Sequence, residues 1–174
     1  MVEHDVTNLF DRITVAISRV TMLLTGVLVV VMFYEVVVRY LFEKPTLWAN
    51  ELSMWIAGII YLFAGLYVMQ QRAHIRIFLL YDAVPRNVQR LFDLVSTLLI
   101  VAFAFAIIWG SFGDAWQKLV TWEREGTAWN PPIPATMKPL LLLTIVLIAL
   151  QSVANLIADW SREEKEVHDI VDEL

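Results

Sequence analysis

The sequence predicts an all-α integral membrane protein with four transmembrane helices and an interfacial amphipathic segment between the second and third helices. Of its 174 residues, 59% are hydrophobic and 18% are charged, whereas roughly half of a soluble domain is apolar and about a quarter is charged. The apolar residues lie in long blocks instead of recurring with a helical or strand period. The bilayer is therefore the predicted solvent for most of the chain.

Four blocks are long enough to cross a membrane as helices. Residues 52–71, 94–113 and 139–158 each contain 20 residues without a charge, and residues 20–34 contain 15. About 20 apolar residues span the hydrocarbon core at a rise of 1.5 Å per residue. The first block is interrupted by Glu35, after which the apolar pattern resumes. We predict a single membrane domain, residues 1–174, with spans at about 15–41, 49–71, 88–116 and 138–160 and a polar tail at 161–174.

The distribution of lysine and arginine predicts the orientation. With a cytoplasmic N-terminus, the inner side carries eight of these residues and the outer side five. Positive residues accumulate on the cytoplasmic side of membrane proteins. We therefore predict a multi-pass protein with both termini in the cytoplasm.

Residues 73–84 are too short to span the membrane and too apolar for a free loop. We predict that this segment lies in the plane of the membrane interface. Basic residues and a histidine in and around it are predicted to anchor it to lipid headgroups; they are Arg72, His74, Arg76, Arg86 and Arg90.

The sequence argues against an enzyme, a metal site and a bound cofactor. It has no cysteine, which excludes disulfides and thiolate chemistry. Its histidines, His4, His74 and His168, lie outside the spans, so paired haem ligands are missing. Nucleophile elbows and phosphate-binding glycine loops are missing too. We predict no catalytic residue, and the absence of a basic run argues against nucleic acid as a partner.

Charged residues near the outer ends of the first two spans are candidates for contact with a partner protein. Glu35 and Arg39 lie one helical turn apart. They are interpreted either as an ion pair at the membrane interface or as a docking point for a partner helix. Thr46 or Asn50 is expected to cap the second helix, with Glu51 near the positive end of its dipole. Alternatively, Glu51 meets Arg39 or a basic group of a partner.

Small and amide side chains predict close helix packing. Gly58 and Gly65 lie seven residues apart in the second helix and let another helix approach, whether from this chain or from a partner. Gln151 and Asn155 share a face of the fourth helix and offer hydrogen bonds between helices. The partner-contact candidates are Glu35, Arg39, Trp48, Glu51, Gly58 and Gly65.

Several local patterns resemble the DctQ-like small membrane subunit of tripartite ATP-independent periplasmic (TRAP) transporters, over about residues 15–160. They are Arg39-Tyr40-Leu41-Phe42, Trp48-Ala49-Asn50-Glu51-Leu52, His74-Ile75-Arg76 and Trp129-Asn130-Pro131-Pro132. Each pattern is weak alone, but their order and spacing together are fairly specific. The family often has a second acid beside Glu51, where this chain has Asn50, so no role for a carboxylate pair is implied.

The resemblance implies a subunit in the bacterial inner membrane that works with two partners, a large permease subunit and a periplasmic substrate-binding protein. In that family, uptake of an organic acid is driven by a cation gradient, and the small subunit is a scaffold that braces the large one. Membrane lipids are the remaining expected contact.

Two other functions remain open from the residues. Some four-helix exporters use one glutamate in their first helix, so the chain could be a self-sufficient small antiporter that uses Glu35. It could also be the membrane anchor of another complex.

Overall fold

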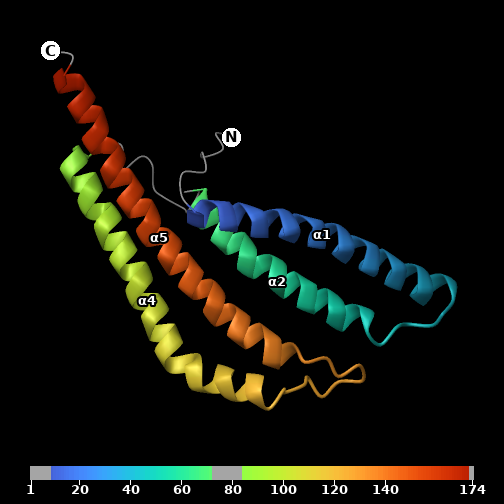
Figure 1. The fold of residues 1–174 in the computed structure, drawn as a ribbon. Coiled ribbons are helices and arrows are strands. Elements are labelled where there is room, and N and C mark those ends of the chain that lie inside the picture. The colour runs from blue at the N-terminus through green and yellow to red at the C-terminus, as the bar shows by residue number, and fades with distance from the viewer. Residues whose placement is uncertain (1–8, 72–83, 173–174) are drawn as a thin grey trace.

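The protein is described by a computed structural model in which residues 9–71 and 84–172 are placed. Four helices occupy these ranges: α1 (Leu9–Leu41), α2 (Ala49–Gln70), α4 (Arg86–Val120) and α5 (Ile133–Asp172) (Figure 1). No strand occurs within the placed ranges. The predicted all-α class with four long apolar helices is confirmed.

Each helix contains a stretch that is long and apolar enough to cross a membrane. These stretches are Thr14–Leu41, Ala49–Gln70, Val88–Val120 and Ile133–Ala158. The shortest has 22 residues, which extend about 33 Å at the helical rise and match a hydrocarbon core about 30 Å thick. Where the membrane begins and ends along each helix stays a prediction.

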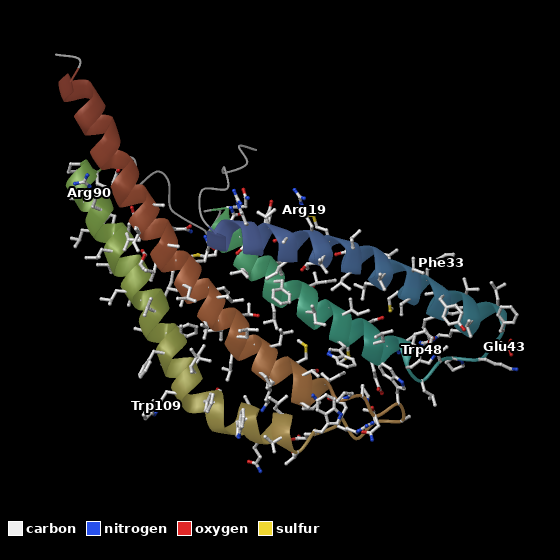
Figure 2. All side chains as sticks on the ribbon, viewed as in Figure 1. Arg19, Phe33, Glu43, Trp48, Arg90 and Trp109 are labelled. Atoms are coloured by element: carbon white, nitrogen blue, oxygen red, sulfur yellow. The ribbon has the colours of Figure 1, made fainter. Side chains whose placement is uncertain are left out.

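The predicted interfacial segment falls almost entirely in residues 72–83, outside the described residues, together with Arg72, His74 and Arg76. Arg86 is the first residue of α4, although its side chain is not described. Arg90 lies one turn further along, near the end of α4 that is far from the 121–132 turn (Figure 2).

The helices form two antiparallel hairpins. In one hairpin α1 packs along α2, and in the other α4 packs along α5; the hairpins join mainly through α2 and α5 (Figure 1). The turns of both hairpins lie toward the lower right of Figure 1, so they share one end of the molecule. α2 and α5 are therefore the inner helices of the assembly.

The outer helices expose most of their apolar surface. Within the most apolar stretch, 11% of the residues of α1 and 6% of those of α4 are buried, against 22% for both α2 and α5. Phe33 on α1 and Trp109 on α4 point away from the neighbouring helices (Figure 2). Lipid tails solvate such side chains, whereas water would not, so these faces suit a membrane.

Two glycines of α2 face α5. A Cβ placed on Gly58 would lie 2.6 Å from Cε of Met137 in α5, and one on Gly65 would lie 3.8 Å from Cδ1 of Ile148. Helices in membranes associate through such close packing because hydrocarbon offers no hydrophobic driving force. The nearest neighbour of both glycines is thus a helix of the same chain.

The α2–α5 contact predicts a position-dependent cost of adding side-chain volume. Gly58→Leu should lower the free energy of unfolding by about 1–3 kcal/mol, because the added atoms overlap Met137 and overpack the contact. The control is Gly26→Leu in α1, where an added Cβ meets nothing within 4 Å. The two variants are compared by thermal unfolding in mild detergent. Equal melting temperatures for the two would contradict this packing.

Candidate functional site

The carboxylate of Glu35 is the centre of a polar cluster at the end of α1. Glu35 is only 2% exposed. Its Oε1 accepts hydrogen bonds from Arg39, at 3.0 Å from Nε and 2.6 Å from Nη2. Its Oε2 accepts a hydrogen bond from the Thr46 backbone N–H at 3.1 Å and another from the Thr46 hydroxyl. Both carboxylate oxygens are therefore engaged by donors of the same chain.

These hydrogen bonds close the turn between α1 and α2. Arg39 reaches Glu35 because residues four apart share a helix face, whereas Thr46 comes from the connecting segment eleven residues away. Tyr34 and Trp48 stack across the same turn, with ring centroids 5.9 Å apart. The turn is therefore held to α1 by a buried carboxylate and by an aromatic pair.

The expectation that Thr46 or Asn50 caps α2 is wrong. The N-cap residue is Trp48, which makes no capping hydrogen bond through its side chain. Asn50 is already inside the helix. Thr46 lies two residues before the N-cap. Its hydroxyl donates to the Glu35 carboxylate, which the turn brings within reach, in a charge-assisted hydrogen bond.

Glu51 and Ser53 carry polar atoms with no partner among the described residues. Oε2 of Glu51 and Oγ of Ser53 are buried, and no hydrogen bond to either is found there. Glu51 lies in the first turn of α2, where the helix dipole favours its negative charge. A contact between Glu51 and Arg39 or a partner remains a prediction.

A second polar cluster lies at the opposite end of the α1–α2 hairpin. The Thr14 hydroxyl donates to Oε1 of Gln151 at 3.4 Å, and Nε2 of Gln151 donates to Oδ1 of Asn155 at 3.0 Å. Nδ2 of Asn155 donates to the backbone carbonyl of Met69 at 2.8 Å. Gln151 is 1% exposed. These bonds tie α5 to α1 and to α2, as the shared face of Gln151 and Asn155 predicted.

Thr46, Thr14 and the Met69 carbonyl were missed as members of these clusters. Thr46 bonds a residue eleven positions away and Thr14 one 137 positions away, so no helical or strand period relates them. The sequence held one weak indication for Thr46. Its hydroxyl can donate a hydrogen bond, and it lies in a short turn close to the acidic residue Glu35.

No group of three or more His, Asp or Glu side chains that could hold a metal ion lies within residues 9–71 and 84–172. The chemistry that the two clusters offer is hydrogen bonding between segments of the chain. Their role in the described structure is to fix helix ends.

Four long apolar helices in two hairpins define a multi-pass helical membrane protein. Residues 28–162 match the family of the DctQ component of tripartite ATP-independent periplasmic transporters. The match covers most of the chain, and the protein belongs to this family, whose members are transporter components.

A curated relative comes from the same class of transporter. The chain is 26% identical over 96 residues to the C4-dicarboxylate TRAP transporter small permease protein DctQ of Vibrio cholerae serotype O1. The alignment covers 55% of this chain and 41% of the relative, so the matched part of the chain spans about two fifths of the relative's length.

The Glu35 cluster predicts that one substitution loosens the α1–α2 turn. Glu35→Ala removes the acceptor for the Thr46 amide, so hydrogen exchange of that amide should accelerate about tenfold through local opening. Glu35→Gln keeps one acceptor oxygen and should give a smaller increase. Exchange followed by mass spectrometry on residues 42–48 measures both, with Asp114→Asn as a control in the other hairpin. Unchanged exchange in Glu35→Ala would show that the turn is held by other contacts.

Proposed function

We propose that the chain is the small scaffold subunit of a TRAP-type secondary transporter that imports organic acids with a cation gradient. In this role it braces the large permease subunit in the bacterial inner membrane, and a periplasmic substrate-binding protein delivers the substrate. The main support is membership of the DctQ component family over residues 28–162. The name of the Vibrio cholerae relative, which specifies C4-dicarboxylate, supports an organic acid as substrate.

The form of the described helices supports a bracing role. Transporters build substrate and ion sites from helices interrupted near the middle of the membrane. The described helices run unbroken for 22 to 40 residues. Among them, one proline lies beyond the first turn of its helix: Pro139, which is close to the start of α5. Long continuous helices with exposed apolar faces suit a rigid support for another membrane subunit.

We place both termini in the cytoplasm and the two hairpin turns in the periplasm. The Glu35 cluster is then periplasmic, and the Thr14–Gln151–Asn155 cluster is near the cytoplasmic side. Arg90, near the cytoplasmic end of α4, would contact lipid headgroups together with Arg72, His74, Arg76 and Arg86.

The contact with the large subunit is proposed at the α1–α2 turn. The side chain of Arg39 is 42% exposed although it pairs with Glu35, so its guanidinium has donors left for a partner. Trp48 and Glu51 lie on the adjacent start of α2. Gly58 and Gly65 would act indirectly, because both face α5 and Gly58 makes the tighter contact there, which sets the shape that the partner meets.

The alternative of a self-sufficient antiporter finds no support in the surroundings of Glu35. A carrier glutamate must exchange its ion or proton, but this carboxylate is buried and accepts hydrogen bonds from Arg39 and Thr46. It also lies only six residues from the end of α1 at Leu41, about 9 Å along the helix axis.

The membrane-anchor alternative differs in its partner, which would be a soluble enzyme subunit.

Co-purification tests the proposed function. The chain, tagged at its C-terminus, is extracted from native membranes in mild detergent, and its stoichiometric partners are identified by mass spectrometry. A large polytopic permease at one to one is expected. A homodimer alone would favour the antiporter, and soluble enzyme subunits would favour the anchor; either result contradicts the proposal.

Arg39→Ala tests the contact itself. This change should lower the yield of the permease complex about fivefold, because an exposed arginine at an interface often carries much of the binding energy. The control is Lys44→Ala, which removes another exposed positive charge from the same turn. Equal yields for both variants would remove Arg39 from the interface.

A further inference from the structure

An apolar groove lies between α4 and α5 near the 121–132 turn. Its volume is about 200 Å³, and every lining residue is apolar. Ala115 and Leu142 are buried at the contact of the two helices, whereas Phe112 and Trp116 stack on each other at the side, with centroids 6.4 Å apart. Because alanine is small, it leaves a furrow beside the larger aromatic rings.

The groove extends from near the end of the helices toward the membrane interior. On α4 its lining runs from Leu119 to Ile108, and on α5 from Pro139 to Val146. Eleven residues of α4 correspond to roughly 16 Å along the helix axis. The furrow is thus long in the direction in which lipid chains lie.

Charged residues of both signs lie beside the outer half of this groove. Asp114 of α4 forms an ion pair with Lys138 of α5, and Lys118 pairs with Glu123 at 2.6 Å. Asp114, Lys118 and Lys138 each precede a lining residue directly in sequence. The Asp114–Lys138 pair is about half exposed, so it contributes little to stability and can share its charges with a ligand at small cost.

These charges lie within two helical turns of the helix ends at the 121–132 turn. Asp114 lies six residues before the end of α4 at Val120, about 9 Å along the axis. Lys138 lies five residues after the start of α5 at Ile133. Charged side chains at this depth reach the interface by extending along the helix, where phosphate and ammonium groups of lipids are found.

We propose that this groove is a phospholipid site, in which one acyl chain lies along Phe112 and Leu143 and a zwitterionic headgroup with a primary ammonium lies among Asp114, Lys118 and Lys138. The ammonium meets the carboxylate of Asp114, and the phosphate meets the two lysines. A headgroup with both signs complements the alternating charges, whereas a purely anionic headgroup meets Asp114 as a like charge. The site goes beyond the proposed function and does not depend on it.

Photo-crosslinking in lipid nanodiscs tests the site. The purified chain is reconstituted with phosphatidylethanolamine that carries a diazirine in its acyl chain, and labelled peptides are mapped by mass spectrometry. Labelling should concentrate on residues 108–119 and 139–146. Leu143→Trp, which fills the groove from its exposed side, should reduce this labelling at least about fivefold, since a filled cavity offers no room for the chain.

Two controls separate a specific groove from general lipid contact. Leu150→Trp adds the same side chain to an exposed position on α5 outside the groove lining, and it should leave labelling unchanged. Val146→Trp fills the groove from a second position and should repeat the loss, which guards against misfolding of one variant. Labelling spread evenly over the exposed apolar faces, or unchanged in both groove variants, would overturn the proposal.

Headgroup preference tests the charged end of the groove. Phosphatidylethanolamine should label the groove about two- to fivefold more than phosphatidylglycerol with the same acyl chains, a range set by the strength of exposed ion pairs. Asp114→Asn should remove this preference because the carboxylate that favours the ammonium is lost. Equal labelling by the two lipids in the unmodified chain would refute the headgroup assignment.

A photoreactive residue at position 143 tests for a protein occupant in native membranes. Cross-links to a protein and to no lipid would assign the groove to a partner's side chain instead.

Discussion

The helix arrangement of this protein follows from one constraint. Apolar helices in a bilayer gain no hydrophobic stabilisation when they bury apolar surface against one another. Lipid tails are as apolar as the side chains that they solvate, so helices associate through close packing and polar contacts. That is why α1 and α4 remain largely exposed while the contacts between hairpins are concentrated on α2 and α5. Gly58 against Met137 supplies the close packing. Buried polar side chains supply the rest.

These polar side chains act at opposite ends of the α1–α2 hairpin. At one end Glu35 holds the turn to α1 through Arg39 and Thr46. At the other end Gln151 and Asn155 of α5 bond Thr14 and the Met69 carbonyl. A polar group in hydrocarbon is costly unless it is paired, so each cluster specifies one arrangement of its helices. Fixing both ends of the hairpin makes it a stiff element, which suits a scaffold.

Sequence reasoning succeeded where the physics is local and failed where contacts link distant segments. The four helices follow from block length, and the approach of Glu35 to Arg39 follows from the helical period. The partner of Glu35 across the turn, Thr46, lies outside any period, as does the bond from Thr14 to Gln151. The capping expectation failed because α2 begins at Ala49, which puts Thr46 two residues before the N-cap and Asn50 inside the helix. The sequence also left open the neighbour of Gly58, because spacing alone does not identify a facing helix.

Transport by reconstituted protein is the most direct test of the central claim. The claim is that the chain supports a transporting partner and does not itself move substrate or ions. Proteoliposomes would contain either the chain alone or the chain with its co-purified permease and binding protein, under sodium and proton gradients imposed in turn. The account predicts gradient-driven uptake of an organic acid with the complete set and none with the chain alone. Ion flux by the chain alone that is lost in Glu35→Gln would contradict the account and establish a self-sufficient transporter.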